Sequence, residues 1–104
     1  MITQTIDDLV PGATKYHLAV ENKDFKFIEN SKPEFLEIVD RDGESPLHYA
    51  AVNDDIEMCK LLLKINPKLK NIKCIENKTA LDWALEYHLE YNTHYTLIMY
   101  LLDN

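Results

Sequence analysis

One stretch of this 104-residue chain recurs 34 positions further on, and this internal repeat constrains the fold more than any other feature. Residues 33–51 read PEFLEIVDRDGESPLHYAA, and residues 67–85 read PKLKNIKCIENKTALDWAL, with no gap in the alignment. Apolar, turn-forming and hydroxyl residues each pair with their own kind. The pairs are Pro33 with Pro67, Phe35 with Leu69, Ile38 with Ile72, Gly43 with Asn77, Ser45 with Thr79, Leu47 with Leu81, Tyr49 with Trp83, and Ala50 with Ala84. A fixed period of this size indicates a stack of repeated units.

Each unit is predicted to form a helix, a tight turn, a second helix and an extended loop. In the middle unit, Ser45 is a suitable N-cap and Pro46 takes the first helical position, where its missing N–H costs nothing. Residues 53–55 are typical of a turn, and apolar residues at helical spacing over 56–63 predict the second helix. Asn66-Pro67 should end that helix.

A third, less regular copy lies upstream. Residues 14–19 (TKYHLA) align with residues 45–50 (SPLHYA). The interval from His17 to the next proline is three residues shorter than the interval from His48 to its next proline. We therefore expect the second helix of the first unit to be shorter by about one turn.

Two motifs of the middle unit carry a family resemblance. They are DGESPLHYAA (residues 42–51) and LLL (residues 61–63). They are similar to the ankyrin repeat pattern D-x-x-G-x-T-P-L-H-x-A-A, followed by V-x-L-L-L. The last unit resembles it through TALDWA (residues 79–84), with Asp82 in place of the usual His and Asn77 in place of the usual Gly. The resemblance implies an all-α ankyrin-repeat solenoid, in which helix-turn-helix units stack and their loop tips extend to one side.

The chain divides into segments of a single domain, and three repeats are about the fewest that form a stable stack. Because Leu101-Leu102 comes six residues later than the middle unit predicts, we expect a six-residue insertion in the last unit, either as a longer first helix or as a longer turn. That unit, with its polar Asp103-Asn104 end, should cap the stack. In order, the segments are an N-terminal cap segment (1–13), a degenerate repeat (14–39), a regular repeat (40–73) and a C-terminal capping repeat (74–104).

Composition excludes several classes of function. The 18 Asp and Glu against 11 Lys and Arg give a formal net charge of −7, so we expect no nucleic acid partner and no anionic membrane surface. The N-terminus does not resemble a signal peptide, and no apolar run is long enough to span a bilayer. Two cysteines are too few for a disulfide framework, which favours a cytoplasmic protein. We expect Cys59 in the core and Cys74 exposed in a loop.

Candidates for catalysis or metal binding are sparse. His17 and His48 occupy the repeat's own histidine position, where the ring is expected to hydrogen-bond to the hydroxyl of its N-cap. His88 and His94 are six residues apart, which does not place them on one helical face, so we expect exposed polar side chains. No nucleophile or phosphate-binding motif is present. We expect no enzyme activity, cofactor or metal; a metal or catalytic site using His88, His94 and Tyr95 is a remote alternative.

Protein binding is the function that the resemblance implies, through a concave surface of loop tips and first helices. The position after the repeat's histidine falls on Leu18, Tyr49 and Trp83, and exposed Tyr and Trp are frequent interface hot spots. Trp83 is alternatively covered by the insertion or by the C-terminal cap. The candidate partner-binding residues are Leu18, Asp40, Arg41, Asp42, Glu44, Tyr49, Val52, Asn53, Ile75, Glu76, Trp83, Glu86 and Tyr87.

Charge is unevenly distributed along the chain. Residues 34–57 hold eight acids and one base, residues 58–78 hold six lysines and one acid, and residues 79–104 hold four acids and no base. The stack should place most acids on the concave side and the lysines on the convex side. A solvated surface explains charge in general, but the segregation favours a basic partner. We therefore expect a monomer that inhibits or neutralises a basic protein, for example as a toxin immunity protein. A scaffold, an adaptor or a secreted effector is the alternative.

Overall fold

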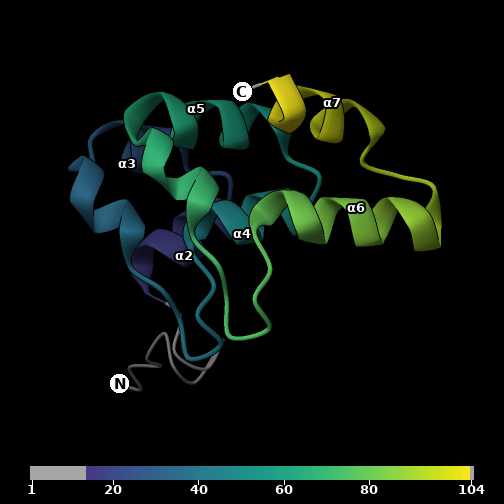
Figure 1. The fold of residues 1–104 in the computed structure, drawn as a ribbon. Coiled ribbons are helices and arrows are strands. Elements are labelled where there is room, and N and C mark those ends of the chain that lie inside the picture. Colours follow the sequence, from purple (N-terminus) through teal and green to yellow (C-terminus); the bar gives the residue numbers. More distant parts are fainter. Residues whose placement is uncertain (1–13, 104) are drawn as a thin grey trace, which may run out of the picture.

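The computed structural model describes residues 14–103, and every element in this range is a helix (Figure 1). The predicted N-terminal cap segment, residues 1–13, lies outside the described residues. The helices form three successive pairs, as the all-α solenoid prediction requires. The pairs are α2 (Lys15–Glu21) with α3 (Phe25–Glu29), α4 (Pro46–Val52) with α5 (Ile56–Ile65), and α6 (Ala80–Tyr91) with α7 (Tyr95–Asp103).

Each first helix begins at a reciprocal cap that the sequence encodes. The N-cap hydroxyl accepts a hydrogen bond from a backbone N–H of the first turn, and the third helical residue accepts one from the N-cap backbone. This arrangement satisfies two of the N–H groups that a helix start leaves unpaired. It confirms the structural role predicted for the two repeat histidines. The three capping pairs are Thr14 with His17, Ser45 with His48, and Thr79 with Asp82.

The irregular repeats differ from the middle repeat in helix length. α3 has five residues against ten in α5, so the second helix of the first repeat is shorter, as predicted. α6 has 12 residues against seven in α4, and both are followed by a three-residue turn. The insertion is therefore a five-residue extension of the first helix, rather than the six residues predicted. Leu101-Leu102 of α7 corresponds to Leu62-Leu63 of α5.

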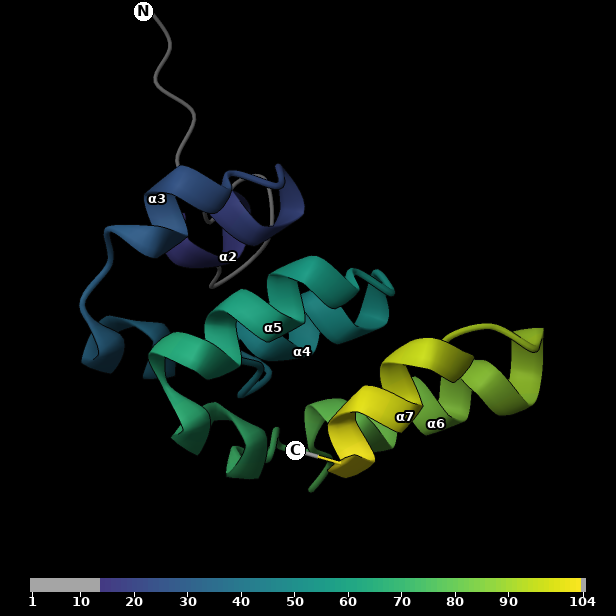
Figure 2. The same ribbon diagram turned by 90° about the horizontal axis from the view of Figure 1, so that it is seen from above.

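The repeats stack in chain order and share one core. α4 packs between α2 and α6, α5 packs against α3, and Figure 2 shows α3, α5 and α7 following one another across the stack. Ile28, Met58 and Leu97, one from each second helix, are fully buried. Burying a side chain of this size contributes about 1.5–3 kcal/mol, and a single repeat could not bury its own apolar face.

A short 3-10 helix follows each of α3 and α5, where the sequence predicts only extended chain. They are η1 (Pro33–Glu37) and η2 (Pro67–Asn71), and each begins at a proline. Leu36 of η1 and Leu69 of η2 are fully buried. Each of these 3-10 helices therefore connects the second helix of one repeat to the loop of the next. Each also adds one leucine to the core.

The two loops that lead into α4 and α6 extend to the same side and contact each other at their tips (Figure 1). The backbone N–H of Ile75 donates to the carbonyl of Asp42 at 2.9 Å. Gly43 and its counterpart Asn77 both have positive φ angles, of 77° and 63°, which explains why asparagine can stand where the repeat uses glycine. Cys74 is buried between the loops, so the expectation that it is exposed is wrong.

The last repeat leaves large apolar side chains of α6 and α7 exposed. They are Leu85, Leu89, Tyr91, Tyr95, Met99 and Leu102.

Candidate protein-binding surface

An acidic pocket opens beside the first loop, where the first two repeats meet. Its volume is about 370 Å³. Three carboxylates of the wall come from the loop itself, and Glu21 comes from the end of α2. Glu21 is not among the predicted residues, although the repeat alignment places it on the same helical turn as Val52. The wall consists of Glu21, Asp40, Asp42, Glu44, Tyr49, Val52 and Asn53, six of which are predicted partner-binding residues.

Hydrogen bonds hold two carboxylates of the acidic wall in place. The Tyr49 hydroxyl donates to Oδ2 of Asp40 at 2.6 Å. Oδ1 of Asp40 accepts from the backbone N–H groups of Asp42 and Glu44, both at 2.9 Å. Across the pocket, Nδ2 of Asn53 donates to Oε1 of Glu21 at 2.7 Å. The carboxylates of Asp40 and Glu21 are thus held by hydrogen bonds within the chain.

The pocket has a negative potential. Burial raises the pKa of Glu44, and the nearby carboxylates of Asp40, Asp42 and Glu76 raise it further. Burial and the hydrogen bond to Asp40 also raise the pKa of the Tyr49 hydroxyl, which therefore stays protonated. A cationic group in the pocket would relieve this repulsion between carboxylates.

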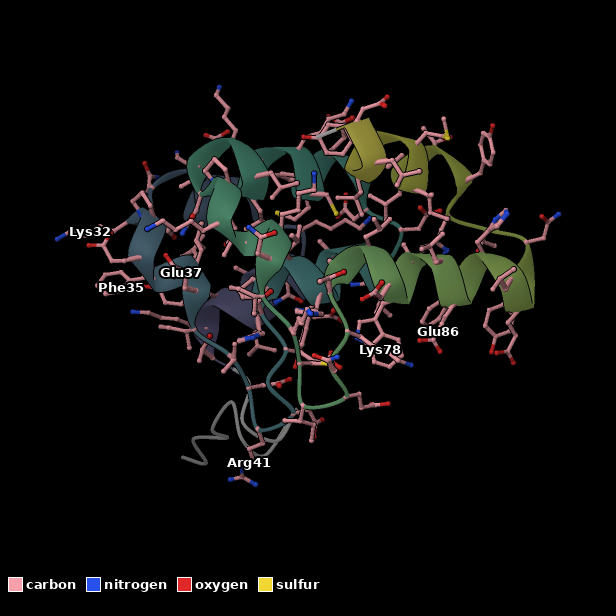
Figure 3. The ribbon with its side chains drawn as sticks, viewed as in Figure 1. Lys32, Phe35, Glu37, Arg41, Lys78 and Glu86 are labelled. Carbon is pink, nitrogen blue, oxygen red and sulfur yellow. The ribbon has the colours of Figure 1, made fainter. Side chains whose placement is uncertain are left out.

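Other predicted residues lie outside the pocket. Leu18 is half-buried on α2 and does not line the wall. Arg41 lies at the tip of the first loop (Figure 3), and Ile75 and Glu76 are exposed at the tip of the second. Glu76 still contributes to the potential, because its charge raises the pKa of Glu44.

The predicted residues of α6, which are Trp83, Glu86 and Tyr87, line a separate, smaller hollow of about 160 Å³ together with Glu90 and Tyr91. Trp83 is half-buried, and Nζ of Lys78 lies 4.5 Å from its ring centroid. The same ammonium group pairs with Glu86, and Figure 3 shows Lys78 and Glu86 beside each other. Trp83 is therefore neither fully exposed nor fully buried, and a lysine covers part of its ring. The predicted partner-binding residues that line a hollow are thus divided between two separate hollows.

Two buried histidines connect the repeats. Nε2 of His17 donates to the carbonyl of Glu44 at 2.7 Å, and Nε2 of His48 donates to the carbonyl of Lys78 at 2.9 Å. Burial lowers the pKa of both rings. Asp82 occupies the same position in the last repeat, and a carboxylate cannot donate such a bond.

The remaining histidines, His88 and His94, form hydrogen bonds at the turn between α6 and α7. Nε2 of His94 donates to the carbonyl of Val52 at 3.0 Å, and Thr93 Oγ1 lies 2.6 Å from its Nδ1. His94 is buried by this contact, so the expectation that it is an exposed polar residue is wrong. His88 Nδ1 donates to the carbonyl of Thr93 at 2.7 Å. Within residues 14–103, no group of three or more His, Cys, Asp or Glu side chains is placed to hold a metal ion.

Both cysteines are free thiols. Cys59 is fully buried in α5, as predicted, and burial raises its pKa to about 12. A thiol in this state is protonated and unreactive at neutral pH. Cys59 is therefore part of the core rather than a nucleophile.

Comparison with known proteins agrees with this geometry. A family model described as ankyrin repeats, with three copies, matches residues 16–104. A search of curated proteins gave no match. No helix within residues 14–103 is sufficiently long and apolar to cross a membrane. Ankyrin repeats indicate a protein–protein interaction module, and the family is typically non-enzymatic. Since the match spans nearly the whole chain and includes all three helix pairs, the chain belongs to the ankyrin repeat family.

Proposed function

We propose that this chain binds a basic protein through the acidic pocket and inhibits it. The observation that carries the proposal is a set of four carboxylates around the half-buried ring of Tyr49. They belong to Glu21, Asp40, Asp42 and Glu44, and those of Glu21 and Asp40 are held by hydrogen bonds. Such a set is suited to one lysine or arginine side chain presented by the partner.

The chemistry of the wall matches such a side chain part by part. The carboxylates can accept charge-assisted hydrogen bonds from an ammonium or guanidinium group. The ring of Tyr49 can contribute a cation–π interaction, and the Val52 side chain can contact the apolar stem. The pocket volume of about 370 Å³ is large enough for one long side chain.

Charge outside the pocket supports the same orientation of the partner. The lysines of the second helix and its exit lie away from the loops, where Lys60, Lys64 and Lys70 line a basic hollow beside Tyr100. A basic partner would be repelled from that side and attracted to the loop side. This separation favours rapid, oriented association that weakens as salt concentration rises.

The proposed consequence of binding is neutralisation of the partner, as an immunity protein neutralises a toxin. The pocket can cover a cationic group that the partner needs for its own activity. Two free thiols, Cys59 and Cys74, suit the reducing cytoplasm. A scaffold, an adaptor or a secreted effector acting on host proteins would use the same pocket without inhibiting its partner, and an activity assay separates these possibilities.

Affinity capture from the native host with a matched pair of variants tests the proposal. The pocket variant carries Asp40→Asn, Asp42→Asn and Glu44→Gln. The control carries Glu29→Gln, Glu34→Gln and Glu57→Gln, which neutralise three exposed acids outside the pocket. We expect the unaltered chain and the control to capture the same basic protein, and the pocket variant to lose it.

Equimolar chain should then abolish the activity of the captured protein, while the pocket variant should not. Equal capture by both variants, or capture of acidic proteins alone, would overturn the proposed pocket. Capture without loss of the partner's activity would overturn the inhibitor role and favour a scaffold.

A further inference from the structure

The two ends of the repeat stack expose positions that are buried inside it. Leu63 of the second repeat is 7% exposed and lines a hollow together with Tyr100 of α7, whereas its counterpart Leu102 in the last repeat is 59% exposed. Likewise, Ala51 is fully buried, whereas its counterpart Leu85 is 38% exposed. The last repeat thus presents an apolar stacking surface with no described element over it.

We define the C-terminal end face as Leu85 and Leu89 of α6 with Tyr95, Met99 and Leu102 of α7. These residues are spaced by three or four positions within each helix, so they form one stripe per helix. The stripes themselves carry no charge. The last repeat is acidic overall, since residues 74–104 contain five acids against one lysine, Lys78.

The opposite end is apolar and basic. Phe27 of α3 is half-buried, whereas its counterparts Met58 and Leu97 are fully buried. A hollow of about 350 Å³ opens here, and Tyr16 lies 5.5 Å from Phe27 and 5.9 Å from Phe35 between ring centroids. We define the N-terminal end face by the residues that line this hollow, which are Lys15, Tyr16, Phe27, Asn30, Ser31, Lys32 and Phe35.

We propose that the C-terminal end face of one copy stacks on the N-terminal end face of a second copy, head to tail. The contact would continue the order in which the repeats already stack within one chain. An apolar surface on an acidic repeat would meet an aromatic hollow lined by Lys15 and Lys32, so both packing and charge are complementary. A two-fold contact between two C-terminal faces would instead bring two acidic repeats together.

The geometry allows further growth of such an assembly. Lys32 and Phe35 lie on the side of the molecule away from α6 and α7, as Figure 3 shows, so one copy can use both faces at once. A head-to-tail contact of this kind is heterologous and leaves a free face at each end of the assembly. The chain would therefore form dimers and longer oligomers as its concentration rises, in place of the monomer expected from the sequence.

Sedimentation velocity with complementary variants tests the proposal. The C-face variant carries Leu89→Glu and Leu102→Glu, and the N-face variant carries Lys32→Glu and Phe35→Glu; all four side chains are exposed, and circular dichroism confirms folding. Ile75→Glu and Val39→Glu are the matched control, because they add two acids at exposed apolar positions outside both faces.

We expect the unaltered chain and the control to sediment faster with rising concentration, and each face variant alone to stay monomeric. An equimolar mixture of the two face variants should form a one-to-one dimer and grow no further, because only one intact pair of faces remains. A monomeric unaltered chain at every concentration would overturn the proposal. So would an N-face variant that associates like the unaltered chain, which would indicate a C-terminal two-fold dimer. Neither result bears on capture through the acidic pocket.

Discussion

The hydroxyl of Tyr49 donates a 2.6 Å hydrogen bond to Oδ2 of Asp40, and this contact joins α4 to the loop before it. The bond has an ionised acceptor and lies at the wall of the acidic pocket. The same residue pair therefore contributes to stability and, in the proposed function, to binding.

Two substitutions at Tyr49 separate the hydroxyl from the ring. Tyr49→Phe removes the hydrogen bond to a charged acceptor, and we expect the free energy of unfolding to fall by about 1.5–3 kcal/mol, measured by urea denaturation. Tyr49→Ala also removes the ring, and we expect partner binding to weaken by about 2 kcal/mol or more in calorimetry. Equal partner affinity for all three chains, each folded by circular dichroism, would exclude Tyr49 as a binding residue.

The buried histidines predict a loss of stability in mild acid. Burial lowers the pKa of His17 and His48, so the unfolded chain takes up protons on these rings at a higher pH than the folded chain does. Stability should therefore fall as the pH drops below about 6.5. Glu44, with its raised pKa, acts in the opposite direction, but only at a lower pH, nearer its own titration range.

Urea denaturation at several pH values from neutral to mildly acidic measures this effect. His48→Gln keeps a side-chain donor for the carbonyl of Lys78 but cannot titrate. We expect this variant to be less stable than the unaltered chain at neutral pH and to lose less stability on acidification. An unchanged pH dependence in the variant would show that the pKa of His48 is the same in the folded and the unfolded chain.

Gly43 is required at the tip of the first loop for two reasons. Its φ angle is 77°, and an added Cβ would lie 3.0 Å from the backbone nitrogen of Ile75. We expect Gly43→Ala to lower the free energy of unfolding by about 1–3 kcal/mol. Asn77→Gly is the control, because glycine adopts positive φ without strain, and its effect should stay below about 1 kcal/mol. A thermal melt that shows equal stability for Gly43→Ala and the unaltered chain would contradict this account.

Trp83 is the only tryptophan in the chain, so its fluorescence reports on the third repeat. The ammonium group of Lys78 lies 4.5 Å from its ring centroid. We expect Lys78→Ala to shift the emission maximum to longer wavelength, because water replaces the lysine over the ring. Lys73→Ala, an exposed lysine of the same loop, should leave the spectrum unchanged. Equal spectra for both variants would show that Lys78 does not cover the ring in solution.

Local sequence signals predicted the framework of this fold. Ser45 and Pro46 mark the start of α4 because capping and proline preference act within one helical turn. The 34-residue offset between Ser45 and Thr79 predicted the stack, because equal patterns form equal helices. The acids of the first loop could be assigned to one side for the same reason, although their role in binding stays a proposal.

Local sequence signals could not predict the contacts between repeats. Cys74 is buried only because one loop packs on the next, and His94 is buried only because its ring reaches the carbonyl of Val52 at the end of α4. The insertion was predicted as six residues instead of five, because the three leucines at 61–63 permit two alignments with Leu101-Leu102 that only the helix bounds distinguish.

The sequence by itself therefore determined the period, the helix starts and the loop turns, which depend on residues a few positions apart. Tertiary structure decided which surfaces remain open. It brought Glu21 to the loop acids and placed Lys78 over Trp83, and it left Leu102 exposed although its counterpart Leu63 is buried. The physical reason is that burial depends on the neighbouring repeat, and an identical side chain is core or surface according to whether such a neighbour is present.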